Sequence, residues 1–483
     1  MSMNRQNETP IYDALQEYIQ NRIVSFDVPG HKQGKGHKAL VDAFGQKCIS
    51  MDLNSSKPLD NLTHPTGVIR EAEILTAEAF RASQAFLITN GTTAAVQNMI
   101  FSCCRQNDKI IMPRNVHKSV INAMVICGAA PVYVNPGIEP ELGISLGMSV
   151  SDVKMAVSEH PDAKAILVNN PTYYGVCSDL REIVRIAHDA GMLALIDEAH
   201  GTHLYFGEDL PLSAMDAGAD MSAVSIHKTG GSLTQSSMLL LGPGVDAEAV
   251  RQIINLTQTT SGSYLLMASL DIARKNLFLH GKEIFERVCS LSEYARREVN
   301  KIPGLRAFGK EIINGETVFD FDRTKLSIHT RAMGLAGIEV YDILRDEFGI
   351  QIEFGDIGNV LAIISVGDRE LEIERLLGAL AEIQRRFSRD PMNMLDHEYI
   401  DPQVAMTPQQ AFQAKKKSVT IKESLGMISA ELVMAYPPGI PILAPGERLT
   451  AEIIDYISYA KEKGCVMTGT KDMEMNNIET VEE

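Results

Sequence analysis

The chain has 483 residues, 45% of them hydrophobic and 22% charged, and a formal net charge of −17. This length exceeds a single hydrophobic core, so two or three domains are expected. Nucleic-acid binding requires a basic footprint, and the sequence has no lysine- or arginine-rich stripe. No apolar run is long enough to span a membrane, and residues 1–10 lack the apolar core of a signal peptide. We therefore expect a cytoplasmic protein that binds neither nucleic acid nor membrane.

Residues 1–60 are expected to form an N-terminal arm, with one helix at residues 12–23 followed by irregular, glycine-rich chain. From residue 81 onward, short apolar runs alternate with segments of helical length such as residues 180–190. Near-continuous apolar strands separated by helices indicate an α/β fold whose sheet is buried on both faces. The link between the last two runs is too short for a helical crossover, so one strand is expected to run antiparallel. The runs are residues 85–89, 109–112, 131–134, 165–168, 193–196, 223–226 and 238–241.

The second half of the chain predicts smaller domains. A long helix is expected at residues 269–299, and residues 302–304 mark a break. Residues 436–441 contain three prolines and are not expected to form regular structure, and the tail from Lys471 is expected to fray. The predicted domains are an arm at 1–60, a large domain at 61–300, a small α/β domain at 301–390 and a C-terminal domain at 391–483. Within the small domain, strands are expected near 317–321, 350–353 and 360–364, and helices at 337–347 and 369–387.

The motif Ser225-Ile226-His227-Lys228-Thr229-Gly230 is the strongest chemical signal. It follows a strand-like run, and a lysine at the end of a buried strand is poorly hydrated, so its amine can attack a carbonyl. Ser225 and His227 would hold a phosphate beside it. Together they describe an anchor for pyridoxal 5′-phosphate, whose aldehyde condenses with a lysine amine. The alternative for Lys228 is an ordinary surface lysine.

Two further motifs follow predicted strands. Gly91, Thr92 and Thr93 open a helix directly after the run ending at residue 89, where free backbone N–H groups and hydroxyls form an anion site. An ordinary helix cap is the alternative. Asp197 ends the run 193–196, at the edge where α/β sheets bind ligands, and a carboxylate there would pair with the pyridine nitrogen of the cofactor. A helix cap or surface turn is the alternative for any single aspartate.

His117 and Asn170 also follow predicted strands. The His117 imidazole would stack on a flat cofactor, although a loop histidine is more often simply exposed. Asn170 or Thr172 would reach the phenolic oxygen of the cofactor, and a turn initiated by Pro171 is the alternative. His200 and His203 form a His-x-x-His pair without a further acidic or thiol ligand nearby, and the seven scattered cysteines contain no Cys-x-x-Cys, so no metal is expected.

These motifs lie beyond successive strand ends, which favours one shared site over several coincidences. Over most of its length the chain resembles the Orn/Lys/Arg decarboxylase family of fold-type-I pyridoxal-phosphate enzymes, and it is most similar to the short bacterial arginine decarboxylases of polyamine synthesis. The resemblance implies a mostly parallel seven-stranded sheet with helices on both faces, plus smaller C-terminal α/β domains. The matching segments are residues 29–32, 113–119, 199–201, 225–237, 259–261 and 436–441.

The resemblance also implies residue roles. Lys228 would bond to the cofactor, Asp197 would pair with its ring nitrogen, and His117 and Ala199 would lie against its two faces. Thr260 would reach the phosphate of a neighbouring subunit, so a homodimer or higher homo-oligomer with shared sites is expected. The larger members carry an extra N-terminal wing domain, for which this chain has no room. The remaining cofactor-binding residues would be Gly91, Thr92, Thr93, Asn170, His200, Ser225 and His227.

The implied reaction is α-decarboxylation of a basic amino acid, with L-arginine giving agmatine and carbon dioxide. Lysine and ornithine remain open as substrates, since the three differ mainly in length and in guanidinium versus ammonium. A fold-type-I aminotransferase is a second alternative, and a catalytically silent binding protein is a more remote one. A long cationic side chain needs a carboxylate partner, and Glu353 and Asp356 are the candidates. A solvated acidic turn is the alternative for both.

Overall fold

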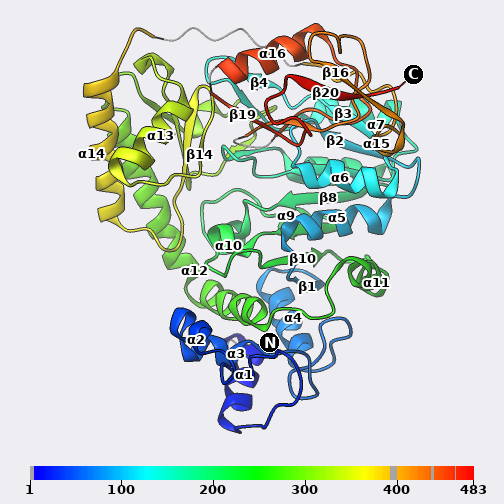
Figure 1. Ribbon diagram of the computed structural model, residues 1–483, viewed down its shortest axis with the longest axis vertical. Coiled ribbons are helices and arrows are strands. Elements are labelled where there is room, and N and C mark those ends of the chain that lie inside the picture. Colours follow the sequence, from blue (N-terminus) through cyan, green and yellow to red (C-terminus); the bar gives the residue numbers. More distant parts are fainter. Residues whose placement is uncertain (1–4, 392–399, 437–439, 463, 483) are drawn as a thin grey trace. The chain divides into compact units, whose positions relative to one another are not determined.

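The computed structural model describes residues 5–391, 400–436, 440–462 and 464–482 (Figure 1). The chain divides into two compact units. Unit 1 comprises Met1–Ser102, Ile196–Glu208 and Leu212–Phe285, and unit 2 comprises Cys103–Leu195, Asp209–Pro211 and Glu286–Glu483. None of the helices within these described ranges is long and apolar enough to cross a membrane.

The largest sheet has seven strands in the order β1-β10-β9-β8-β6-β2-β3. Strand β10 runs antiparallel to both β1 and β9, whereas β2 runs parallel to both β3 and β6. The predicted sheet and its antiparallel strand are therefore confirmed. The strands are β1 (Gln84–Ile88), β2 (Lys109–Pro113), β3 (Ala130–Val134), β6 (Ala165–Asn169), β8 (Leu193–Glu198), β9 (Met221–Val224) and β10 (Ser237–Leu241).

Helices connect these strands, and their apolar periodicity matches their burial. In α8, Leu180, Ile183 and Ala187 are buried at helical spacing, and the Asp179 side chain caps the helix by accepting from the backbone N–H of Glu182. The helices of this part are α1 (Pro10–Gln20), α2 (Lys38–Phe44), α3 (Gln46–Met51), α4 (Val68–Ala79), α5 (Gly91–Cys103), α6 (Lys118–Cys127), α7 (Val150–Glu159), α8 (Leu180–Asp189), α9 (Ala214–Ala217), α10 (Ile226–Thr229), α11 (Ala247–Thr257) and α12 (Tyr264–Val299).

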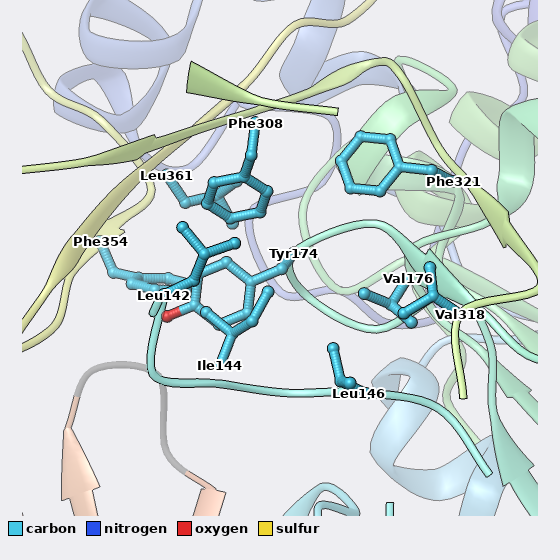
Figure 2. Close-up of a cluster of buried hydrophobic side chains, with 10 residues drawn as sticks. All are labelled: Leu142, Ile144, Leu146, Tyr174, Val176, Phe308, Val318, Phe321, Phe354 and Leu361. Atoms are coloured by element: carbon cyan, nitrogen blue, oxygen red, sulfur yellow. The ribbon is translucent and has the colours of Figure 1, made fainter. Parts of the chain in front are cut away.

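A second, four-stranded antiparallel sheet lies in unit 2, in the order β11-β13-β15-β14. Helices α13 and α14 pack against each other beside it (Figure 1). Figure 2 shows the core cluster next to this sheet, where the ring of Tyr174 lies among Phe308, Phe354 and Leu361. The elements are β11 (Arg306–Phe308), β13 (Lys325–His329), β14 (Phe354–Gly355), β15 (Asn359–Ile363), α13 (Gly337–Phe348) and α14 (Glu370–Phe387).

The C-terminal region has its own core. Strand β17 lies between β18 and β19, β16 pairs with β20, and Val433, Leu443 and Ile457 are buried together. The elements are α15 (Pro408–Gln413), α16 (Ala451–Glu462), β16 (Lys416–Thr420), β17 (Val433–Tyr436), β18 (Ile440–Leu443), β19 (Val466–Thr468) and β20 (Asn477–Val481). The remaining short elements are β4 (Ile138–Glu139), β5 (Ile144–Ser145), β7 (Val176–Cys177), β12 (Asp320–Phe321), and the 3₁₀ turns Arg5–Asn7, Thr202–Tyr205, Lys310–Ile312 and Arg331–Met333.

Several local expectations were wrong in the first half of the chain. The N-terminal arm holds two further helices, α2 and α3, because His37 caps α2 and Gly45, at φ +81°, turns the chain between them. Strand β9 ends at Val224, so Lys228 lies in the one-turn helix α10 rather than at the strand end itself.

In the small sheet, residues 350–353 were expected to form a strand, but only Phe354–Gly355 pairs with β15. Gly349 ends α13 in the left-handed region, and the N–H of Ile350 still donates to the carbonyl oxygen of Leu344. Ile350 is therefore part of the helix end, and the strand that pairs with β15 begins only at Phe354. Of residues 317–321, only Asp320–Phe321 forms a strand, and it pairs with β7 instead of joining the small sheet.

The C-terminal expectations also need correction. Tyr436 ends β17 and Pro441 lies within β18, while residues 437–439 fall outside the described residues. Proline is accommodated because β18 is an edge strand. The tail does not fray: the Asp472 carboxylate accepts backbone N–H groups of a turn, and β20 then pairs with β16. The four-domain division stays a prediction.

Candidate active site

Lys228 lies in the short helix α10, which begins directly after the buried strand β9. Ser225, between the two elements, is fully buried, and Lys228 is half-buried. The Nζ atom of Lys228 lies 2.8 Å from Nε2 of His200, which is also buried. A contact of this length carries one hydrogen, donated either by the ammonium or by the imidazole N–H. The lysine amine is therefore held in one place by a neighbouring ring.

Asp197 is the penultimate residue of β8, and its side chain is 4% exposed. Its carboxylate accepts a hydrogen bond from the backbone N–H of Ala199 at 3.2 Å. Burial raises the pKa of Asp197, and the charge of Lys228 and the Ala199 hydrogen bond oppose this rise only in part. A cationic N–H group placed against this carboxylate would restore its ionised form.

The predicted anion site lies where α5 begins. Gly91, at φ +78°, is the first residue of the 13-residue helix α5. As at any helix N-terminus, the first N–H groups of α5 have no acceptor within the helix. The Thr92 hydroxyl lies 2.7 Å from the Ser237 hydroxyl. Ser237 is paired with Ile88 in the sheet, which brings the start of β10 beside the start of α5. Thr93 is exposed on the same first turn.

The two predicted phosphate-binding side chains after β9 belong to the same group. Nδ1 of His227 lies 3.1 Å from the Ser225 hydroxyl and 3.2 Å from the carbonyl oxygen of Ser236. Since a carbonyl only accepts, Nδ1 of His227 carries a hydrogen. Ser236 and Ser237 thus connect the Thr92 turn with the Ser225–His227 turn, and sequence reasoning gave neither serine a role.

His117 and Asn170 belong to unit 2. His117 is the N-cap residue of α6: its Nδ1 accepts from the backbone N–H of Ser119 at 3.2 Å and lies 2.8 Å from the Ser119 hydroxyl. In the neutral ring the hydrogen is therefore on Nε2. Asn170 is 1% exposed, and its side-chain oxygen accepts from the N–H of Ser178 at 2.9 Å.

The proposed substrate residues also lie in unit 2. The Glu353 side chain is exposed, and within the described residues it makes no ion pair. Asp356 instead accepts hydrogen bonds from the Tyr174 hydroxyl and from the N–H groups of Gly358 and Asn359. Burial raises the pKa of Asp356. Asp356 is thus engaged inside its own unit, whereas Glu353 faces solvent.

Thr260 is exposed in unit 1, in the turn where the neighbouring Thr259 hydroxyl accepts from the N–H of Ser261. Its expected role in a partner subunit stays a prediction. His203, half of the predicted His-x-x-His pair, lies 3.3 Å through Nδ1 from the Thr229 hydroxyl. His200 and His203 therefore both contact α10, and they fix the turn that carries Lys228.

Unit 1 thus contains an amine, a buried carboxylate and two turns rich in groups that can donate hydrogen bonds to a phosphate. These groups fit pyridoxal phosphate: the amine suits its aldehyde, and the hydroxyls, imidazole and helix N–H groups suit its phosphate. Asp197, whose pKa is raised by burial, suits a protonated ring nitrogen. The residues of unit 1 that would hold the group are Gly91, Thr92, Thr93, Asp197, Ala199, His200, Ser225, His227 and Lys228.

Similar proteins were found by sequence and by structure. An arginine decarboxylase of Bacillus subtilis (strain 168) is 43% identical over 483 residues, covering 99% of each chain. An arginine decarboxylase of Halalkalibacterium halodurans is 42% identical, covering 100% of this chain and 99% of the other. A lysine decarboxylase of Francisella novicida shares the fold at a TM-score of 0.84 with 21% identity, covering 98% of this chain and 81% of that chain.

The model of the Orn/Lys/Arg decarboxylase major domain matches residues 9–372, and the model of the C-terminal domain of that family matches residues 392–472. Together with the two arginine decarboxylases, which are similar over nearly their whole length, and the shared fold of the lysine decarboxylase, these matches confirm both the resemblance and the fold-type-I architecture. The chain belongs to the Orn/Lys/Arg decarboxylase family.

Proposed function

We propose that this chain uses pyridoxal phosphate, bonded to Lys228, to remove the α-carboxylate of L-arginine, giving agmatine and carbon dioxide. The observation that carries the cofactor assignment is the position of Lys228, whose Nζ lies 2.8 Å from Nε2 of His200, the third residue after the buried Asp197. The arginine assignment is supported by relatives named arginine decarboxylase that are 41–43% identical over nearly the whole chain.

When bound, the cofactor supplies an electron-withdrawing ring that makes loss of the substrate carboxylate possible. The residues of this chain prepare that chemistry. The first turn of α5 and the Ser225–His227 turn would hold the phosphate and so fix one end of the group. Asp197 would lie against the ring nitrogen and favour its protonated form, because a buried carboxylate is stabilised by a cationic partner.

A proton must return to Cα of the substrate after the carboxylate leaves, and two groups of this chain are suited to deliver it. His117 carries its hydrogen on Nε2, since Nδ1 is used to cap α6. Lys228 is the other donor, and its amine is held by His200. Either group would act as a general acid: the Cα–carboxylate bond breaks, carbon dioxide leaves, and the donated proton forms a C–H bond at Cα in its place.

The expected homodimer with shared sites, the cytoplasmic location and the polyamine role belong to this proposal as well. The polyamine role and the homodimer are supported by the resemblance, and the shared sites also by the exposed position of Thr260 in the single chain. The cytoplasmic location is supported by the composition of the sequence. Glu353 is the proposed partner of the guanidinium, since its carboxylate faces solvent while that of Asp356 accepts several internal hydrogen bonds.

The test is purified protein loaded with pyridoxal phosphate and given arginine, lysine or ornithine in turn. Carbon dioxide and the amine product are both measured, with Lys228→Ala as the control. The proposal expects equal amounts of carbon dioxide and agmatine, fastest with arginine, and no turnover by the control. Faster release of cadaverine from lysine would overturn the arginine assignment alone. Formation of a keto acid without carbon dioxide would show an aminotransferase.

A further inference from the structure

The helix that carries His117 is held by the C-terminal region at its N-terminal side. Strand β2 ends at Pro113 and Arg114 follows immediately. His117, three residues after Arg114, is the N-cap of α6, which begins at Lys118. The Arg114 side chain is 7% exposed. Its Nη2 donates to Oε2 of Glu447 at 2.9 Å, and its Nη1 donates to the carbonyl oxygen of Pro441 at 3.1 Å.

The acceptor side of this contact is equally fixed. Glu447 is 2% exposed, and the same Oε2 accepts from the backbone N–H of Ala444 at 2.8 Å. The Arg114 guanidinium also lies 5.1 Å from the centre of the Tyr133 ring. A planar guanidinium group that is hydrogen-bonded to two separate acceptors and lies over an aromatic ring has little freedom to rotate.

The C-terminal region also contacts the other end of α6. Helix α15 packs against α6, and the Gln409 amide donates to the carbonyl oxygen of Ile126 at 3.1 Å. The fit is close, since a Cβ added at Gly128 would lie 2.7 Å from the Gln409 side-chain oxygen. Residues from the segment that matches the C-terminal domain of the family therefore hold α6 at both ends.

We propose that Arg114 and Glu447 are positioning residues: through them the C-terminal region sets the orientation of His117 for its part in the reaction. The inference rests on the proposed function, in which His117 donates a proton. A buried ion pair is a weak source of stability, because well-packed apolar residues can replace it, and its best-supported use is to specify one arrangement. Here the ion pair would specify the conformation of the turn Arg114–His117, which ends in the His117 imidazole that caps α6.

The experiment compares Arg114→Met, Glu447→Leu and the double variant with wild type. Each single variant leaves a buried charge without its partner, whereas the double variant replaces both charges with apolar side chains. The matched control is the exposed pair Glu382 and Arg385 on α14, which are 2.6 Å apart, changed to Leu and Met together. The double variant is expected to regain most of the wild-type melting temperature, and the control to keep it.

The first readout is amide hydrogen exchange in the protein without cofactor. In the double variant, the peptide covering residues 114–119 is expected to exchange at least about tenfold faster than in wild type, because its fixed anchor is gone. Peptides from α14 are expected to be unchanged. If the double variant does not fold, Glu447→Gln, which keeps the shape and removes the charge, is measured in the same way. Wild-type exchange at residues 114–119 in the folded variant would overturn the inference.

The second readout is steady-state kinetics with arginine. The double variant is expected to lose roughly tenfold or more in kcat with KM within about twofold, as for a misplaced catalytic group. Unchanged kcat in a folded variant would overturn the inference and leave the proposed function intact. An inactive wild-type protein would instead refute the proposed function, while the exchange measurement would still decide whether the C-terminal region orders residues 114–119.

Discussion

Nζ of Lys228 and Nε2 of His200 lie 2.8 Å apart, although the two residues are 28 positions apart in the sequence. The contact joins the turn after β8 to the turn after β9. It gives the lysine amine a fixed partner that can share a hydrogen. Asp197, the penultimate residue of β8, adds a buried carboxyl group to the same part of unit 1. One strand end therefore supplies both the group that holds the amine and the group that would hold the ring nitrogen.

The first prediction concerns Asp197. Asp197→Asn keeps the shape of the side chain but removes the charge that would stabilise a protonated ring nitrogen. We expect kcat to fall by at least about 10²-fold, in line with the loss of a preorganised electrostatic partner. Cofactor content is measured in parallel by absorbance, so that a loss of binding is distinguished from a loss of rate. Near-normal turnover with the cofactor still bound would show that Asp197 has a different role.

The strands of the large sheet could be predicted from sequence because burial on both faces leaves almost no polar residues in them. All of Leu239, Leu240 and Leu241 in β10 are fully buried, for example. Strand β20 escaped prediction since it pairs on one side only and includes Asn477 and Glu479, so it carries no continuous apolar run. Its turn depends on the Asp472 carboxylate, which a single aspartate in a polar tail does not reveal.

The individual candidate residues of the site could be predicted from sequence because each of them follows a strand or opens a helix. The contacts between them could not. The Thr92–Ser237 contact depends on the register that sets Ser237 against Ile88, and serine at the start of an apolar strand gives no signal of its own. The pairing of Arg114 with Glu447 joins positions 333 residues apart, beyond the reach of any local pattern.

The second prediction concerns recognition of the substrate side chain. Glu353→Gln removes the carboxylate proposed to hold the guanidinium, and this contact acts in the ground state and the transition state alike. We therefore expect KM for arginine to rise by a larger factor than that by which kcat falls. Glu316→Gln, another exposed glutamate of unit 2, serves as the control. An unchanged KM in Glu353→Gln would remove Glu353 from the site.

The third prediction tests whether the sites are shared between subunits. If Thr260 serves the neighbouring subunit, Lys228→Ala and Thr260→Ala are each impaired alone. A mixed dimer would then contain one site with both native residues. Mixing the two variants after mild dissociation is expected to restore activity above the sum of the separate samples. A fully active monomer in sedimentation at assay concentration, or no gain on mixing, would contradict a shared site.

The fourth prediction concerns Glu198, which follows Asp197 and is fully buried. Its carboxyl group contacts the Tyr205 hydroxyl at 2.6 Å, the Ser222 hydroxyl at 2.9 Å and the N–H of Ala214 at 2.9 Å. Burial raises the pKa of Glu198 from its ordinary value of 4.5 to about 8, against the effect of these hydrogen bonds. The folded protein therefore binds this proton more tightly than the unfolded chain does.

The associated stability is present below pH 4.5 and is lost as the pH rises through about 8. At about 1.4 kcal/mol per pKa unit, the difference across this window is a few kcal/mol. Glu198→Gln cannot ionise, so its free energy of unfolding should fall less than that of wild type between pH 5 and pH 8. Urea unfolding at several pH values measures this. Parallel pH profiles for the two proteins would mean that Glu198 titrates normally.

The bond between cofactor and lysine is the most direct test of the whole account. Purified protein loaded with pyridoxal phosphate should show a visible absorption band, and borohydride reduction should remove the band and fix the cofactor to the chain. Proteolysis and mass spectrometry then locate the modified lysine. The account predicts a single labelled peptide that contains Lys228, and none in Lys228→Ala. A label on any other lysine, or a visible band that persists unchanged in Lys228→Ala, would contradict it.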